Sequence, residues 1–218
     1  MENYHAADNR LVQMGPVKTI IPTIILSYVL PSIAMYTAPR LATRQLVNGM
    51  FWQPFPVYAA ILQRIFGLFV KDTTQKDRVE NAQADMPHLR RIYAFAGVAA
   101  AVINLYVRFK SPTPLMEVFF KGISSPSAAA PLMETLAKFL RYDQIAAFSA
   151  GAIWTALSFH DLKKAGKVTA GWGKIVGVFA GTTIVAGPGA AMAAMWAWRE
   201  EALTRRVIAT AKNEEVKK

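Results

Sequence analysis

The stretch TIIPTIILSYVLPSIAMYTAP, residues 19–39, decides the fold class. It contains no charged residue, and Lys18 and Arg40 stand at its two ends. About twenty consecutive apolar residues are enough for a helix to cross the hydrocarbon core of a bilayer. Pro31 is expected to kink this helix, which a bundle of neighbouring helices tolerates in a membrane. The stretch therefore predicts a transmembrane helix.

Four further apolar runs follow, at residues 47–70, 92–107, 144–159 and 175–198. The whole chain is 53% hydrophobic and 18% charged, whereas about a quarter of the residues of a soluble domain are charged. Residues 111–141 mix proline, serine and charges without a run of spanning length, so we expect an interfacial segment that does not cross. We therefore predict an all-α, polytopic membrane helix bundle of about five transmembrane helices, with the interfacial segment between the third and fourth.

The charge distribution points to a lipid partner. The formal net charge is +11, but the Lys and Arg residues form short clusters between the apolar runs, which suits phospholipid headgroups better than nucleic acid. We expect a lipid bilayer as partner and no nucleic acid. Cysteine is absent, which excludes disulfides and thiolate chemistry. No linker divides the chain, so we predict one integral membrane domain, residues 1–218, with polar tails at about 1–17 and 203–218.

Polar and aromatic residues gather at predicted helix ends. With five alternating crossings and a non-crossing segment 111–141, these ends lie on one side of the bilayer. Carboxylates, amides and aromatic rings at one mouth of an apolar bundle predict a binding site. The residues concerned are Trp52, Gln53, Asn104, Tyr142, Asp143, Trp198, Glu200 and Glu201.

Each of these side chains also has a simpler interpretation. Asp143 stands where a carboxylate caps the start of the fourth helix. Glu200 and Glu201 are equally consistent with solvated residues beyond the membrane edge, paired with arginine. A tryptophan at the position of Trp52 is more often an aromatic anchor at the headgroup level than a substrate contact. The residue types alone leave these alternatives open.

The sequence lacks the motifs of several classes of enzyme. The sequence contains no HExxH, CxxC or GxSxG, no Walker-type phosphate loop and no aspartate-rich magnesium repeat. Residues 187–189, GPG, lie inside an apolar run, where they predict a break in the helix and not a phosphate loop. We expect no metal site, so any catalysis is expected to depend on proton transfer.

Five short motifs, dispersed over residues 19–203, resemble a known family. They are IPTIILSYVLP (21–31), FWQPFP (51–56), LRYD (140–143), GP (187–188) and WREE (198–201). Together they resemble the fungal membrane-bound terpene cyclases of meroterpenoid pathways, of the ascochlorin, ascofuranone and macrophorin cyclase type.

The resemblance implies a proton-initiated terpene cyclase, an isomerase or lyase of fungal secondary metabolism that protonates an olefin or epoxide of a prenyl chain. Such a reaction needs a protonated carboxylic acid, a water-poor cavity and aromatic rings that face the cation. The resemblance makes Asp143 the first candidate for the catalytic acid, followed by Glu201 and Glu200. The substrate-binding candidates are Trp52, Gln53, Tyr142, Asn104 and Trp198.

The same resemblance implies that no metal or organic cofactor is required. It also implies a hydrophobic prenylated aromatic substrate that enters from the bilayer, other enzymes of the pathway as partners, and location in the endoplasmic reticulum membrane. The alternative is a non-catalytic membrane scaffold, accessory subunit or carrier of a hydrophobic metabolite. It is supported by the position of every candidate acid at a helix end, where capping accounts for it.

Overall fold

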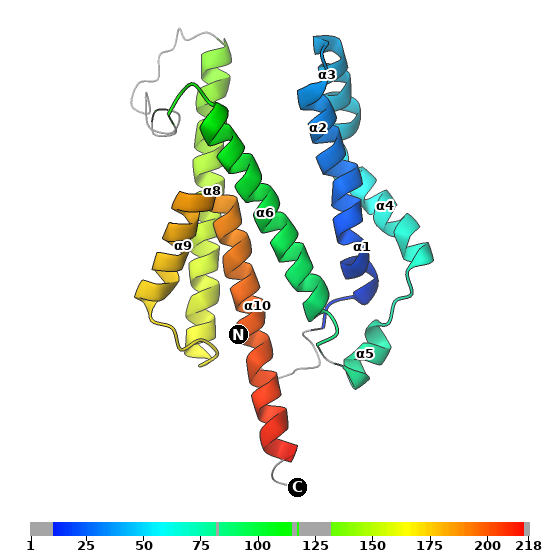
Figure 1. Cartoon of the computed structure of the whole chain (residues 1–218), viewed down its shortest axis with the longest axis vertical. Helices are drawn as coiled ribbons and strands as arrows, with labels where there is room; N and C mark the ends of the chain where they lie inside the picture. Colours follow the sequence, from blue (N-terminus) through cyan, green and yellow to red (C-terminus); the bar gives the residue numbers. More distant parts are fainter. Residues whose placement is uncertain (1–10, 82, 115–116, 118–131, 216–218) are drawn as a thin grey trace. The chain divides into compact units, whose positions relative to one another are not determined.

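The computed structural model describes residues 11–81, 83–114, 117 and 132–215, whose regular elements are all helical (Figure 1). The all-α prediction is confirmed for this part of the chain. The contacts within the chain form two compact units, Met1–Ile92 and Tyr93–Lys218. The single domain stays a prediction.

Unit 1 begins with one long helical stretch. It consists of α1 (Met14–Ile24), the π-helical turn η2 (Ile25–Val29) and α2 (Leu30–Thr37). Pro31 has no N–H to donate to the carbonyl four residues back, and the wider π turn ends just before it. The stretch stops at Thr37 because the next residue, Ala38, precedes a proline and takes the extended ψ of 129°.

The second half of unit 1 is broken where the sequence predicted one transmembrane run, residues 47–70. It contains α3 (Leu41–Val47), the π turn η3 (Asn48–Trp52), α4 (Phe55–Phe69) and α5 (Thr74–Glu80). Pro54 separates η3 from α4, since proline cannot donate the helical hydrogen bond at its own position. α4 packs against α1 and η2 (Figure 1).

A small hydrophobic core fixes the start of α1. Leu11, Met14 and Val17 are buried, and they pack against Val12, Ala84, Leu89 and Ile92. The N–H of Met14 donates to the hydroxyl of Thr74 at 2.8 Å, so a residue of α5 satisfies one of the free amides at the start of α1.

The part of unit 2 that the structure describes forms four helices. They are α6 (Met86–Lys110, of which the part from Tyr93 belongs to this unit), α8 (Leu132–Lys164), α9 (Trp172–Ala186) and α10 (Pro188–Glu215). α10 packs against α9 and α8. Gly189 lets α10 approach α6 closely, because a methyl group there would lie 3.2 Å from the Ala100 side chain of α6, whereas one at Gly97 would make an ordinary contact of 3.5 Å with Ala193.

A reversal of the chain at Gly187 separates α9 from α10. Gly187 has φ 92°, which disfavours any residue with a Cβ, and Pro188 begins α10, where its missing N–H costs no hydrogen bond. The sequence predicted one crossing over residues 175–198. This prediction is wrong, because the run is a hairpin of two helices.

Among the described residues, two helical stretches are long and apolar enough to cross a membrane, Met14–Thr37 and Met86–Lys110. They correspond to the first and third predicted runs. The five-span bundle is not confirmed. Most of the predicted interfacial segment, residues 111–141, and the outer parts of both predicted tails lie outside the described residues.

Candidate functional site

Charged and aromatic side chains meet on α10. Arg199 Nη1 donates to Glu200 Oε1 at 2.7 Å, and the two side chains are only 22% and 12% exposed. The Arg199 guanidinium carbon lies 5.0 Å from the centre of the Trp196 ring, a cation–π geometry. Together with Tyr93 and Trp198, these residues are called the α10 cluster below. It offers a partly buried charge pair beside aromatic faces.

The neighbouring helices of unit 2 complete this cluster. The Tyr93 phenol of α6 lies within electrostatic range of Glu200 and Arg199. On α8, Phe159 contacts Trp198 edge to face at 5.1 Å between ring centres. Phe159 and Leu162 are 1% and 0% exposed. The cluster therefore rests on tightly packed side chains, which hold its polar groups in place.

The structure places the predicted acids at different levels of unit 2. Asp143 is exposed on α8, whereas Glu200 and Glu201 are half-buried on α10. Phe159 lies opposite Trp198, and Asp143 precedes Phe159 by sixteen residues, or about 24 Å of helix. The reversal at Gly187 explains this separation, since it returns the end of α10 to the other end of the bundle.

The remaining predicted residues of unit 2 do not join the α10 cluster. Tyr142 is 47% exposed beside Asp143. Asn104 lies at the α9–α10 turn, where its side chain covers Gly187, and its buried Oδ1 has no hydrogen-bond partner among the described residues. The catalytic and binding roles of these residues stay predictions.

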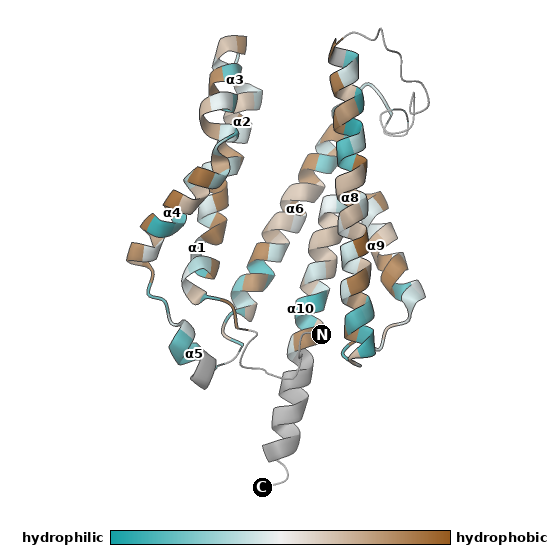
Figure 2. Cartoon of the chain, turned by 180° about the vertical axis from the view of Figure 1, so that it is seen from behind, coloured by the Kyte–Doolittle hydropathy of each residue, from teal (hydrophilic) through white to brown (hydrophobic). Residues whose placement is uncertain are grey.

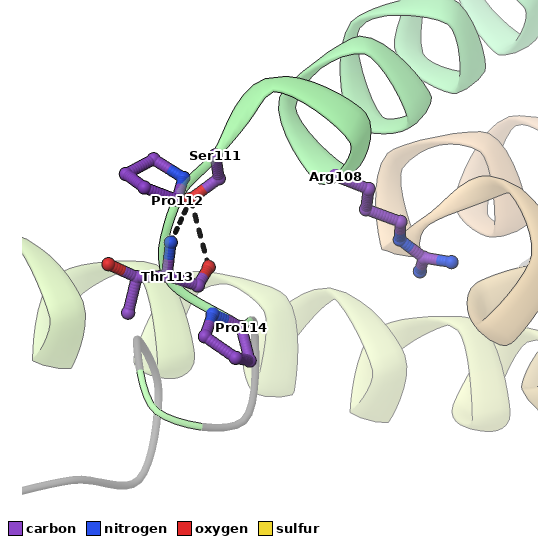
Figure 3. Close-up of a pocket in the computed structure, with 5 residues that line it drawn as sticks. All are labelled: Arg108, Ser111, Pro112, Thr113 and Pro114. Carbon is purple, nitrogen blue, oxygen red and sulfur yellow. Dashed lines mark hydrogen bonds between the residues drawn. The ribbon is translucent and has the colours of Figure 1, made fainter.

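The Arg108 side chain is hydrogen-bonded to the backbone at the same turn. Its guanidinium donates to the carbonyls of Thr183 and Ile184 near the end of α9. The Thr183 carbonyl also accepts from the Gly187 N–H. An open pocket of about 400 Å³ is lined by Arg108, Ser111, Pro112, Thr113 and Pro114. Figure 3 shows that the Arg108 side chain extends away from the other lining residues. The described lining residues therefore present hydroxyl and proline groups to the pocket, and the Arg108 side chain is directed away from them.

An aromatic group in unit 1 contains the predicted residue Trp52. The Tyr28 ring lies 6.0 Å from the Trp52 ring and 5.0 Å from the Phe55 ring, centre to centre. Trp52 Nε1 donates to Ser32 Oγ at 3.1 Å. Gln53 is exposed and donates to Asn48. Trp52 and Gln53 lie in unit 1 and the acids in unit 2, so a shared mouth stays a prediction.

Sequence reasoning missed Tyr28, Tyr93, Trp196 and Arg199 as site residues. The spacing of Trp196 and Arg199, three residues apart on a helix, was an available signal for contact. The described residues contain no group of three or more His, Asp or Glu that could hold a metal ion.

Comparison with known proteins gives a family. Residues 2–204 match the CtvD domain. The chain is 33% identical over 95% of its length to the FAD-dependent monooxygenase BOA8 of Botryotinia fuckeliana, and 29% identical over 94% to the FAD-dependent monooxygenase verC1 of Penicillium polonicum. A third relative, the FAD-dependent monooxygenase anuJ of Penicillium roqueforti, is 31% identical. The chain spans about a quarter of the length of these relatives, 27%, 25% and 25%. No solved structure matches it significantly.

These relatives overturn the resemblance to terpene cyclases. Their names describe oxidation with a flavin, which is a different class of reaction from proton-initiated cyclisation. The predicted meroterpenoid cyclase, isomerase and lyase activities are therefore wrong. The short motifs misled because prolines, tryptophans and acids at helix ends recur in membrane bundles of different function. The expected fungal setting agrees with the organisms of the relatives.

Proposed function

We propose that this chain, which belongs to the CtvD domain family, is the membrane-embedded, substrate-binding unit of an FAD-dependent monooxygenase system in fungal secondary metabolism. The observation that carries the proposal is the coverage of the relatives. Nearly the whole chain matches about a quarter of each FAD-dependent monooxygenase. About three quarters of each relative is left to bind the flavin.

The sequence supports placing the flavin on another unit. A dinucleotide fold needs a strand that leads into a G-x-G-x-x-G turn and a helix. The two Gly-x-Gly pairs here, Gly171 with Gly173 and Gly187 with Gly189, are followed by Val176 and Met192 where the third glycine is required. The described residues contain helices and no strand. The oxidation chemistry then comes from the flavin unit, and this chain binds and orients the molecule that is oxidised.

The distribution of apolar side chains supports the membrane. In the first helical stretch, Leu26, Leu30 and Ile33 are 45–53% exposed, whereas Thr19, Thr23 and Ser27 are buried. Along the candidate span Met86–Lys110, none of the most apolar window is buried. Figure 2 shows mostly apolar or neutral residues along α4, α6 and α9, with hydrophilic residues at α5 and at the ends of α8.

Exposed apolar faces with polar groups turned inward suit a lipid solvent and would aggregate in water. The proposal includes the further crossings of the predicted bundle and location in the endoplasmic reticulum membrane. A lipophilic substrate concentrates in the bilayer, so a helical unit embedded there meets it directly. Within this proposal the α10 cluster is the substrate-facing polar group of unit 2.

A domain replacement tests the function. The matching region of BOA8 is deleted, or replaced by residues 2–204 of this chain, and NADPH-dependent formation of the oxygenated product is measured in microsomes with the relative's own substrate. We expect the deletion to abolish product formation and the replacement to restore at least part of it. Full activity of the deleted form in microsomes would contradict the proposal.

A second measurement tests whether the chain alone binds FAD. The purified chain in detergent is expected to be colourless and to bind no FAD in fluorescence titration, with the relative's flavin unit as the positive control. Stoichiometric binding of FAD to this chain alone would contradict the proposal that another unit binds the flavin.

A further inference from the structure

Three hydroxyl residues line the inner face of the first helical stretch of unit 1. Thr19, Thr23 and Ser27 are four residues apart, so they lie above one another on one face. Their side chains are 4%, 1% and 3% exposed. The Thr19 hydroxyl donates to Gln63 Oε1 of α4 at 2.7 Å, which shows that this face is directed at α4.

Thr23 differs from its neighbours on the helix. Ser27, Ser32 and Thr37 each donate to the carbonyl four residues back, at 2.7–2.8 Å. The buried Thr23 hydroxyl has no partner among the described residues. A buried hydroxyl without a partner is rare, because water or another polar group normally satisfies it.

The helix opposite gives Thr23 no polar partner. Thr19 pairs with Gln63 and Tyr28 contacts Phe55, so α4 runs antiparallel to α1 and η2. This register places Ala59 opposite Thr23. Ala59 carries only a methyl group, which can neither donate nor accept a hydrogen bond.

The π turn η2 begins two residues after Thr23, and its Tyr28 ring contacts Trp52 of the second π turn, η3. Tyr28 belongs to η2 and Trp52 to η3, and the two rings form one aromatic group with Phe55. π turns inserted in α-helices are frequent at functional sites, because the extra residue redirects side chains. Tyr28 follows Thr23 by five residues, or about 7–8 Å along the helix.

We propose that the seam between α1–η2 and α4 binds a lipophilic molecule that carries a carbonyl or ether oxygen. The Thr23 O–H donates to that oxygen, and the apolar body lies along Ala59 toward Tyr28 and Trp52. The inference rests on the proposed function, and it names the seam as the place where unit 1 holds the oxygenated lipophile. No covalent step is involved.

Photolabelling in lipid nanodiscs tests the seam. The probe is a benzophenone with one alkyl chain, since its carbonyl both accepts a hydrogen bond and, under ultraviolet light, inserts into nearby C–H bonds. Labelled peptides are located by mass spectrometry. We expect labelling concentrated on residues 20–28 and 55–63, and competition by an alkyl phenyl ketone but not by the matching hydrocarbon.

Matched variants separate the effect of removing the Thr23 hydroxyl from the effect of unfolding. Thr23→Val keeps the shape and removes the donor, so labelling should fall about fivefold, the loss of one hydrogen bond. Thr23→Ser should retain it. Thr155→Val is the control, because Thr155 is equally buried but already donates to Gly151. Circular dichroism confirms that each variant is folded.

Labelling spread evenly over the lipid-facing side chains, or unchanged in a folded Thr23→Val variant, would overturn the inference. This outcome is distinguishable from failure of the proposed function, because labelling needs no flavin. If the domain replacement succeeds and labelling of the seam fails, only the seam is refuted. Saturable labelling of the seam without any monooxygenation would refute the proposed function and leave the seam as a binding site.

Discussion

Replacing Gly187 with alanine is expected to destabilise unit 2, because two effects act at the same atom. The φ of 92° is unfavourable for a residue with a Cβ, which costs about 1–3 kcal/mol. The new Cβ would also lie 2.5 Å from Asn104 Cγ and 2.6 Å from Nδ2, and overpacking of this kind costs about 1–3 kcal/mol. We expect a total of roughly 2–6 kcal/mol, toward the lower end if the Asn104 side chain moves away.

The assay is thermal and denaturant unfolding in detergent, followed by circular dichroism. The double variant Gly187→Ala with Asn104→Ala removes Cγ and Nδ2 and should recover part of the packing cost but none of the backbone cost. Asn104→Ala alone is the control. A Gly187→Ala variant within about 0.5 kcal/mol of the natural chain would refute the hairpin geometry at this residue.

Three further changes test the packing and charges of the two units. Leu162→Ala removes a side chain that is 0% exposed and should cost about 2–5 kcal/mol in denaturant unfolding; a cost below about 1 kcal/mol would show that the α8 core is misplaced. Arg199→Met leaves Glu200 without the partner at 2.7 Å and should cost roughly 1–2 kcal/mol, because the pair is only partly buried; Glu200→Gln in the same background should recover some of it, and no recovery would argue against the pair. Hydrogen bonds from the Thr74 hydroxyl and N–H lower the pKa of Asp72 below its ordinary value. The contribution of Asp72 to folding stability is therefore complete above the unfolded-state pKa and is lost as the pH falls through the lowered pKa, below about pH 4. Asp72→Asn should reduce this acid sensitivity in pH-dependent melting, and an unchanged profile would contradict it.

The sequence was sufficient for the helical class and for two long apolar helices, since both depend on composition over about twenty residues. It was insufficient where one residue decides the path of the chain. Residues 175–198 have the hydropathy of a single span, but the positive φ at Gly187 reverses the direction. A Gly-Pro pair predicts a break and does not specify its angle. Pro54 likewise interrupts the second predicted run, between η3 and α4.

The candidate site was predicted in part for the same reason. Trp198 and Glu200 lie in a partly buried cluster, whereas Asp143 is exposed at another level of α8. The predicted gathering of all acids at one end depended on the number of crossings, and one reversal changes which ends meet. The buried hydroxyl of Thr23 could not be found from sequence, because an isolated threonine in an apolar run is ordinary until its partners are known.

The most direct test of the account measures whether the exposed apolar faces contact lipid. The chain contains no cysteine, so single cysteines at Leu30 and Val102, which are 49% and 59% exposed, and at the polar position Lys76 report solvent access without interference. A membrane-impermeant maleimide is applied to open membrane sheets and, separately, to denatured protein. The account predicts rapid labelling at position 76 and almost none at 30 and 102 until the protein is denatured. Equal labelling of all three positions in intact membranes would contradict a membrane-embedded unit.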